Sequence, residues 1–327
     1  MYMERVGIVG LGSYLPSKIM KNFDWEEIVE TSDEWIINKT GIRERRIASD
    51  DLCTSDLAVF AAKEAMDNSG VNPEDIDLII LATSTPDVPL SSTAAIVQRK
   101  LGCHNSAAFD INAVCSGWVH ALDIGSRFAG TSGYQNVLVI GSEIYSRILN
   151  WDERSTCVLF GDGAGAALLQ KKKAGGVLGS WLKTDGRGSE VIQIPAGGIR
   201  IPFGSEKFLD DDRYFQMDGR AVWDFAVEAF PEAVHSVLQK VGMKINDVDF
   251  IISHQANLRI IEAGMKKLGL DMDKTFTNIE RYGNTAGASI PIALKEAVEA
   301  KKIKTGNLVI TVGFGGGLSW GANAMIW

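Results

Sequence analysis

The sequence is short of the features that mark several classes of protein. It holds only four cysteines in 327 residues, at positions 53, 103, 115 and 157, and no two of them form a CxxC pair. This pattern argues against a disulfide scaffold and favours reduced thiols. No apolar run is long enough to span a membrane, and the apolar stretch within residues 1–16 is too short for the core of a signal peptide. We therefore expect a cytoplasmic protein with no membrane partner.

Positive charge and phosphate-binding motifs are also scarce. The chain has 33 Lys and Arg residues against 41 Asp and Glu residues, a net charge of −8, and no dense basic run interleaved with aromatics, which argues against nucleic acid as a partner. It contains no GxxxxGK[ST] loop, and the GxG within residues 6–12 lacks the third glycine of a dinucleotide fingerprint. What remains is a globular protein, 46% hydrophobic, with enough chain for one large domain or two closely joined ones.

The sequence does contain an internal repeat. Residues 70–80 (GVNPEDIDLII) align without gaps on residues 242–252 (GMKINDVDFII). Two helical segments end alike, at Leu101-Gly102 and Leu268-Gly269, and the apolar run at 136–141 matches the run at 307–313. Self-similarity of this kind indicates duplicated architecture, so we expect two related halves in which strands alternate with helices.

Cys115 stands at the most informative turn of the first half. Residues 107–111 predict a short buried strand, residues 112–118 (NAVCSGW) a tight turn, and the apolar spacing that follows a helix. Cys115 would then lie at a helix start, where the positive end of the helix dipole favours a thiolate, and we expect the pKa of the thiol to be lowered. The alternative is a buried cysteine that serves only packing.

The repeat adds two polar residues to Cys115. Asn284 falls in the turn of the second half that corresponds to the Cys115 turn, and His254 directly follows the repeated strand. Because functional groups in α/β sheets gather at the carboxyl ends of strands, we expect Cys115, His254 and Asn284 to form one site. The glycines at 315–317 permit close backbone approach, and the amide of Gly316 could form an oxyanion hole with the amide of Cys115. The glycines at 161–166 are interpreted as a crowded crossing of chain segments.

A second candidate site is a tryptophan beside basic residues. Residues 31–37 predict a helix that begins at a Ser-Asp cap, and Lys and Arg residues follow between positions 39 and 46. Trp35 next to this cluster could bind an adenine nucleotide such as coenzyme A. A core tryptophan beside solvated arginines is the alternative.

Together these segments carry a family resemblance that covers essentially the whole chain. The motifs are TSDEWI at 31–36, TGIRER at 40–45, AVCSG at 113–117, FGDGAGA at 160–166, HQANLRII at 254–261, YGNT at 282–285 and GFGGG at 313–317. The chain resembles β-ketoacyl-acyl carrier protein synthase III, a thiolase-fold condensing enzyme. The resemblance implies a homodimer with a duplicated α/β fold and a layered α-β-α-β-α core, divided into residues 1–172, which hold Cys115, and residues 173–327, which hold His254 and Asn284.

The resemblance also implies a reaction. Cys115 takes the acyl group of a short acyl-CoA primer, and His254 and Asn284 assist the decarboxylation of malonyl-acyl carrier protein, whose carbanion then attacks the acyl-enzyme. This decarboxylating Claisen condensation starts type II fatty acid synthesis and needs no metal or redox cofactor. The alternative is a related enzyme of secondary metabolism that takes another acyl-CoA or another acceptor.

Further roles follow from the resemblance alone. The residues expected at coenzyme A are Trp35, Lys39, Arg154 and Asn257. The acyl pocket is expected to be lined by Leu90, Trp118, Tyr145 and Phe160, and the carrier protein to be bound by Arg259, Lys266 and Lys267. Two positions depart from many relatives: Asp224 replaces a frequent lysine, and Leu90 replaces an aromatic residue that some relatives insert across the dimer interface. We therefore expect a less rigid pocket wall that admits primers longer or more branched than acetyl.

Three other enzyme classes fit less well. A cysteine hydrolase also uses Cys, His and Asn, but the duplicated α/β pattern argues against it. A biosynthetic thiolase needs a second cysteine near the C-terminal glycines, and no cysteine follows Cys157. A chain-elongating synthase is expected to carry a histidine at the position of Asn284.

Overall fold

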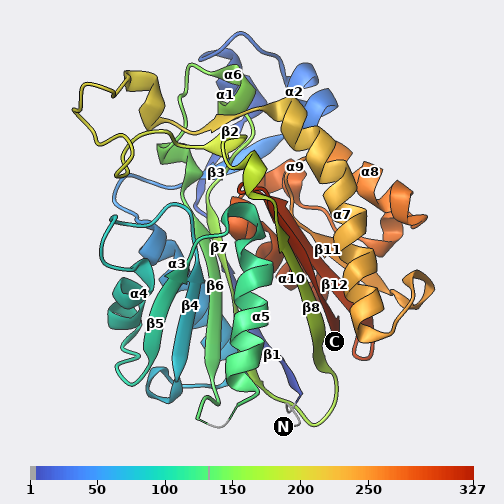
Figure 1. Cartoon of the computed structure of the whole chain (residues 1–327). Helices are drawn as coiled ribbons and strands as arrows, with labels where there is room; N and C mark the ends of the chain where they lie inside the picture. The colour runs from blue at the N-terminus through green and yellow to red at the C-terminus, as the bar shows by residue number, and fades with distance from the viewer. Residues whose placement is uncertain (1–4, 132) are drawn as a thin grey trace.

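The first half of the chain forms a five-stranded sheet in the order β1-β7-β6-β4-β5 (Figure 1). The structure is a computed structural model that describes residues 5–131 and 133–327; residues 1–4 of the N-terminal stretch considered above lie outside it. The sheet consists of β1 (Val6–Tyr14), β4 (Leu78–Ala82), β5 (Ala107–Ile111), β6 (Val137–Glu143) and β7 (Gly163–Lys171). β4 runs parallel to β5 and β6, and β7 is antiparallel to β1 and β6. The central strands β4 and β6 are buried along their whole length, as expected for a sheet covered on both faces.

The second half forms a four-stranded sheet in the order β11-β12-β13-β8. Its strands are β8 (Gly176–Thr184), β11 (Phe250–Ser253), β12 (Leu308–Gly315) and β13 (Ser319–Ile326). β11 is parallel to β12, and β13 is antiparallel to both β12 and β8. β11 and β12 are the counterparts of β4 and β6, so the parallel core of each sheet comes from the repeated segments.

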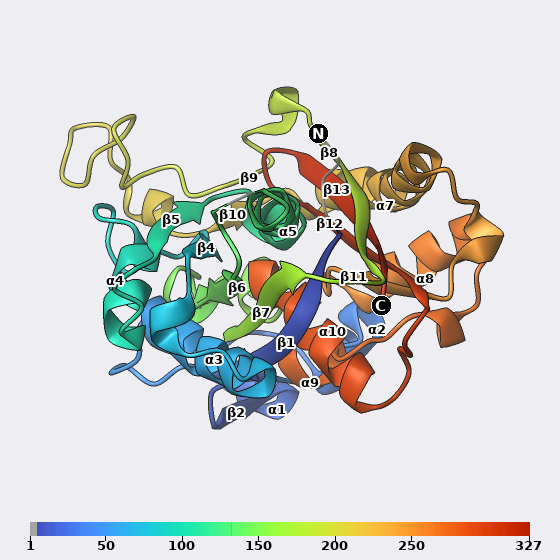
Figure 2. The ribbon, with the colours of Figure 1, turned by 90° about the horizontal axis from the view of Figure 1, so that it is seen from below.

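Helices and sheets alternate in five layers (Figures 1 and 2). α3 (Thr54–Ser69) and α4 (Thr93–Leu101) cover the outer face of the first sheet, and α7 (Gly219–Val241) and α8 (Leu258–Leu268) cover that of the second. α5 (Gly117–Ala129) and α10 (Ser289–Glu299) lie between the sheets and contact both. The predicted α-β-α-β-α core is confirmed. Within residues 5–131 and 133–327, no helix has both the length and the apolar character that crossing a membrane requires.

The backbone reproduces the repeat closely. α3 and α7 end at Gly70 and Gly242, with φ of 70° and 73°, and α4 and α8 end at Gly102 and Gly269, with φ of 79° and 69°. Glycine suits these left-handed caps because it has no Cβ. A short 3₁₀ turn precedes each central helix: η2 (Val114–Ser116) before α5 and η8 (Ala286–Ala288) before α10. Superposing η2 on η8 by number pairs Cys115 with Gly287 and Asn112 with Asn284, so the nucleophile candidate and the amide occupy different positions of equivalent turns.

Shorter elements gather at one end of the sheets, the upper end in Figure 1. They are β2 (Lys18–Lys21), β3 (Glu44–Ile47), α1 (Asn22–Glu26), α2 (Asp33–Thr40), α6 (Arg154–Cys157), α9 (Ile279–Tyr282) and the strand pair β9 (Ile192–Gln193) and β10 (Gln216–Met217). The predicted helix at 31–37 is α2, capped by the Ser32 hydroxyl and ended by Gly41. This end of the molecule holds the candidate site.

The two halves are closely joined. The expected division after residue 172 falls between the end of β7 and the start of β8, and it stays a prediction. α10 of the second half packs against β1 and β7 of the first. A Cβ added to Gly165 of β7 would lie 2.7 Å from Cβ of Pro291 in α10. This contact supports the interpretation of the 161–166 glycines as a crowded crossing.

Candidate active site

The structure brings Cys115, His254 and Asn284 to one cavity of about 260 Å³. They come from η2, from the end of β11 and from the turn between α9 and η8. The three residues are 7%, 1% and 6% exposed, so little of their surface is in contact with bulk solvent. The geometry is that expected from the repeat, and the catalytic roles of the three side chains stay predictions.

Cys115 sits on a strained and crowded turn. Val114, the residue before it, has φ of 47°, a region that β-branched residues rarely occupy. A Cβ added to Gly315 would lie 2.8 Å from Cβ of Cys115, so the end of β12 must be glycine to pass this close. The expected lowering of the thiol pKa is not found. Burial raises the pKa of Cys115, because it disfavours the charged thiolate, and the charge of Glu143 raises it further.

His254 is held as a neutral imidazole. Its Nδ1 lies 2.7 Å from Oγ of Ser289, the first residue of α10, and that oxygen also accepts a hydrogen bond of 3.3 Å from the backbone N–H of Gln255. Burial lowers the pKa of His254 to about 3. When the Ser289 hydroxyl donates to Nδ1, the proton of the ring is on Nε2, and His254 becomes a neutral hydrogen-bond donor.

Asn284 is fixed by three backbone contacts. Its N–H donates to the carbonyl of Leu159 at 2.9 Å, its carbonyl accepts from the N–H of Gly161 at 3.0 Å, and its Oδ1 accepts from the N–H of Ala286 at 2.8 Å. The side-chain oxygen is thereby engaged with the backbone, which leaves Nδ2 as the group that can donate to a ligand in the cavity. The site thus offers a thiol and two neutral hydrogen-bond donors.

A buried carboxyl group supports the floor of the site. Glu143, at the end of β6, accepts hydrogen bonds from Oγ1 of Thr85 at 2.6 Å, from Oγ of Ser84 at 3.0 Å and from Oγ1 of Thr83 at 3.2 Å. Burial raises the pKa of Glu143 to about 7, although these donors oppose the rise. Ser84 is also 2.9 Å from the hydroxyl of Tyr145, so one network joins Glu143 to the aromatic ring beside Cys115.

The mouth of the cavity is lined by three of the four residues expected at coenzyme A, Trp35, Lys39 and Asn257. The fourth, Arg154, lies outside it with its guanidinium 4.9 Å from the centroid of the Trp35 ring. Asn257 caps α8 through Oδ1, and its Nδ2 donates to the carbonyl of Lys39 at 3.1 Å. The indole of Trp35 is half-buried at this mouth, which fits a binding surface better than a core tryptophan.

The residues expected in the acyl pocket fall into three groups. Tyr145 and Phe160 belong to the cluster that surrounds Cys115, with ring centroids 4.7 Å apart. Trp118 is not brought to the cavity: it is completely buried in the core between the sheets. Leu90 is 91% exposed on the loop before α4 and does not line the cavity.

The residues expected at the carrier protein lie on α8. Lys266 and Lys267 are exposed, and Lys267 pairs with Glu228 of α7. Arg259 donates to the carbonyls of Asn38 and Ile37 at 3.1 Å and 3.4 Å and pairs with Glu262, so it also ties α8 to the end of α2. Asp224 is exposed and pairs with Arg220 on the same helix.

Several site residues were missed by the sequence analysis. The cavity is also lined by residues of the β9–β10 segment and of α7, namely Ile192, Phe215, Met217, Val222 and Trp223. Nothing in their spacing marks them, because long-range folding of the chain after β8 brings them there. Glu143 could have been predicted, because it is a charged residue at the carboxyl end of a buried strand. His254, which directly follows β11, was predicted from the same kind of position. Among the described residues, no group of three or more His, Cys, Asp and Glu side chains is arranged to hold a metal ion.

We predict that Glu143→Gln lowers the pKa of the Cys115 thiol. The substitution keeps the shape of the side chain and one of its two acceptor oxygens but removes a negative charge, so alkylation of Cys115 by iodoacetamide should be about tenfold faster, the effect of one pKa unit. The difference should appear above pH 7 and fade below it, where Glu143 itself is protonated. Peptide-resolved mass spectrometry separates Cys115 from the half-buried Cys53. Equal alkylation rates at pH 8 in both proteins would contradict the prediction.

Comparison with known proteins identifies the family. Residues 109–186 match the family described as 3-Oxoacyl-[acyl-carrier-protein (ACP)] synthase III, and residues 238–327 match its C-terminal part. A beta-ketoacyl-[acyl-carrier-protein] synthase III of Caldanaerobacter subterraneus subsp. tengcongensis is 50% identical, over 98% of this chain and 97% of its own length. Another from Clostridioides difficile is 49% identical, over 99% and 98%.

Solved structures give the same result. The crystal structure of 3-oxoacyl-[acyl-carrier-protein] synthase III from Aquifex aeolicus VF5 has a TM-score of 0.91 and 43% identity, covering 98% of this chain and 100% of that one. The priming beta-ketosynthase of the R1128 polyketide pathway has a TM-score of 0.91 and 30% identity, covering 100% and 98%. The resemblance and the thiolase-like fold are confirmed, and the chain belongs to the β-ketoacyl-acyl carrier protein synthase III family.

Proposed function

We propose that this protein condenses a short acyl-CoA primer with malonyl-acyl carrier protein and so starts type II fatty acid synthesis. The observation that carries the proposal is that a thiol, a neutral imidazole and an amide, all on buried residues, meet at one cavity. Relatives near 50% identity that are named for this activity favour it over a role in secondary metabolism, for which the polyketide priming enzyme at 30% identity is a precedent. A cytoplasmic location stays a prediction.

In the first half-reaction the sulfur of Cys115 attacks the thioester carbonyl of acyl-CoA. The carbonyl becomes a tetrahedral oxyanion, for which the amides of Cys115 and Gly316 are the proposed donors. The bond to the coenzyme breaks, coenzyme A leaves as its thiol with the proton that Cys115 gives up, and the acyl group remains on Cys115. Because burial raises the pKa of Cys115, the proton leaves during the attack rather than before it.

In the second half-reaction malonyl-acyl carrier protein loses carbon dioxide. The electrons of the broken C–C bond form an enolate, whose oxygen accepts hydrogen bonds from Nε2–H of His254 and Nδ2–H of Asn284. With a pKa of about 3, His254 stays neutral and donates without transferring its proton. The enolate carbon then attacks the acyl group, the bond from the acyl carbon to sulfur breaks, and Cys115 leaves as the thiolate and takes up one proton from solvent. These steps use only the two thioesters and the side chains, so the proposed reaction requires no metal or redox cofactor.

The pair Trp35 and Arg154 is the proposed site of the coenzyme A adenine. A planar base in van der Waals contact with both groups needs a gap of about 7 Å, twice the usual contact distance. The guanidinium now lies 4.9 Å from the ring centroid and donates to the carbonyl of Glu30 at 2.7 Å. Arg154 must therefore move outward when the base enters. Lys39 and Asn257 at the cavity mouth are proposed to hold the rest of the coenzyme.

We propose that Arg259, Lys266 and Lys267 attract the acidic carrier protein. Both lysines are exposed on the last turn of α8, where opposite charge steers association despite the net charge of −8, although Lys267 already pairs with Glu228. Arg259 contributes less free charge, since it is already engaged with Glu262 and with the carbonyls of α2.

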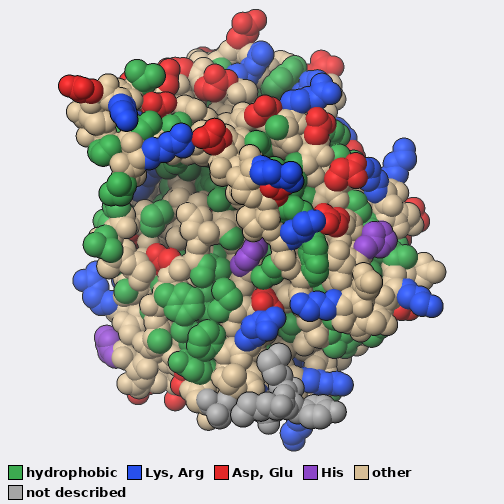
Figure 3. Space-filling model, viewed as in Figure 1, with side chains coloured by type: hydrophobic (Ala, Val, Ile, Leu, Met, Phe, Trp, Pro, Cys, Tyr) green, Lys and Arg blue, Asp and Glu red, His purple; other side chains and the backbone are tan. Residues whose placement is uncertain are grey.

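The proposed homodimer would cover an open sheet edge. β5 pairs only with β4, so its other backbone edge has no strand partner in the described chain. Hydrophobic side chains gather on the face over α5 and β5 (Figure 3), where Phe109 and Ile111 of β5 and Ile124 and Phe128 of α5 are only partly buried. An open edge flanked by apolar surface favours pairing with a second copy. Leu90 would then reach toward the acyl pocket of the partner.

We predict that the three site residues divide between the half-reactions. Cys115→Ala should abolish acyl transfer and condensation. His254→Ala and Asn284→Ala should keep acyl transfer from acetyl-CoA within about threefold but slow malonyl-acyl carrier protein decarboxylation by a factor of 10² or more, as the loss of one oxyanion donor typically does. Intact-mass measurement of acyl-Cys115 and release of labelled carbon dioxide check the two steps. Full condensing activity in Cys115→Ala, or equal losses in both steps for the other variants, would refute this division.

We also predict that Leu90 widens the range of primers. The wild-type protein should accept isobutyryl-CoA and longer acyl-CoAs as well as acetyl-CoA, and Leu90→Phe should lower kcat/KM for isobutyryl-CoA more than for acetyl-CoA, because a larger ring narrows the pocket. A steady-state panel of primers measures this. Val88→Phe, on the same exposed loop, serves as the matched control. Strict preference of the wild type for acetyl-CoA would contradict the prediction.

A further inference from the structure

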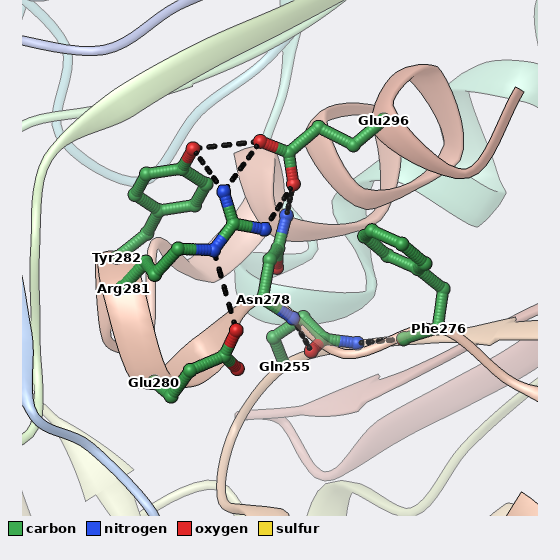
Figure 4. A network of polar contacts seen from close by, with 7 residues as sticks. All are labelled: Gln255, Phe276, Asn278, Glu280, Arg281, Tyr282 and Glu296. Atoms are coloured by element: carbon green, nitrogen blue, oxygen red, sulfur yellow. Dashed lines mark hydrogen bonds and ion pairs between the residues drawn. The ribbon is translucent and has the colours of Figure 1, made fainter. Parts of the chain in front are cut away.

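A second polar network lies behind the cavity, centred on Glu296 of α10 (Figure 4). Its Oε1 accepts hydrogen bonds from the hydroxyl of Tyr282 at 2.6 Å and from Nη1 of Arg281 at 3.1 Å. Its Oε2 accepts from Nη2 of Arg281 at 2.8 Å and from Nδ2 of Asn278 at 2.9 Å. All four donors belong to the α9 segment, residues 278–282, which is separated from Asn284 by Gly283 alone. One carboxylate therefore clamps this segment to α10.

The network continues from α9 to the residue beside His254. The N–H of Asn278 donates to Oε1 of Gln255 at 3.2 Å. Nε2 of Gln255 donates to the carbonyls of Ser253 at 2.9 Å and Phe276 at 3.3 Å. Figure 4 shows Gln255 and Asn278 side by side below Glu296. The backbone on both sides of His254 is thus tied to the segment that leads to Asn284.

The same helix also holds the imidazole. Ser289 and Glu296 are seven residues apart on α10, two turns of the helix, and therefore share a face. Ser289 contacts Nδ1 of His254, and Glu296 holds α9. The contacts form a closed ring that runs from His254 through Gln255, Asn278 and Glu296 and returns along α10 to Ser289. A shift of α10 would therefore displace both proposed donors.

We propose that Glu296 is a positioning residue that fixes His254 and Asn284 relative to one another for the decarboxylation step. The inference rests on the proposed function. The enolate oxygen must meet both donors at hydrogen-bond distance, so a small displacement of either weakens the second half-reaction. Acyl transfer uses Cys115 and the backbone amides of η2 and Gly316, and Glu296 bonds none of these. The loss of the clamp should therefore act on one half-reaction.

The test compares Glu296→Gln with Glu299→Gln. Both remove one negative charge from α10, but Glu299 pairs with Lys295, and no hydrogen bond or ion pair joins it to α9 in the described part of the chain. Glu296→Gln should lower kcat for malonyl-acyl carrier protein decarboxylation about tenfold or more, with KM for that substrate and the rate of acetyl transfer to Cys115 within about twofold of wild type. Glu299→Gln should leave all three unchanged.

A milder variant, Tyr282→Phe, keeps the test decisive if Glu296→Gln does not fold. Tyr282→Phe removes one donor to Glu296 and keeps the ion pair with Arg281; it should lower the same kcat by a smaller factor, again without changing acetyl transfer. Equal reductions of both half-reactions in folded Glu296→Gln, or no reduction in either variant, would overturn the inference. If the wild type itself does not decarboxylate malonyl-acyl carrier protein, the proposed function fails instead. The two failures are therefore distinguishable.

Discussion

Direct contact between backbones where the two repeated turns cross is the constraint on which the site depends. A Cβ on Gly141 of β6 would lie 2.4 Å from the carbonyl oxygen of Gly287, and one on Gly315 would lie 2.8 Å from Cβ of Cys115. Side chains at these positions would push η2, η8 and the ends of β6 and β12 apart. The turn η2 contains Cys115, and η8 follows Asn284. This close packing therefore brings two residues that are 169 positions apart in sequence into one cavity.

Burial determines the chemistry that this cavity can perform. It raises the pKa of Cys115 and lowers the pKa of His254, so both groups are held in their neutral forms. Charge arises only when a thioester binds and reacts, and fixed donors then stabilise it without having to reorient. Such a site gains its rate from preorganisation. The polar contacts behind it, from Ser84 and Glu143 on one side and from Ser289 and Glu296 on the other, therefore help to hold the reacting groups in place.

The sequence predicted the parts of the structure that repeat or have periodic spacing. The alignment of residues 70–80 on 242–252 predicted the two sheets, and the glycine-ended helices fixed the position of the Cys115 turn. The sequence analysis did not predict that Phe215 and Met217 pack near Cys115, because only the long-range folding of the chain brings them there. The thiol pKa was predicted with the wrong sign, because the helix dipole can be inferred from local sequence, whereas burial and the charge of Glu143 depend on the complete fold. Trp118 was placed in the pocket by resemblance and lies in the core.

The central claim is that Cys115 carries the acyl group between two separate half-reactions. A pulse-chase experiment tests it most directly: the protein is mixed with acetyl-CoA, freed of excess substrate, and chased with malonyl-acyl carrier protein while intact mass is followed. The account predicts one acetyl group on Cys115 after the pulse and its quantitative transfer to the carrier as a β-ketoacyl product during the chase. Product formation without any acetylated Cys115, or an acetyl group that the chase cannot remove, would contradict it.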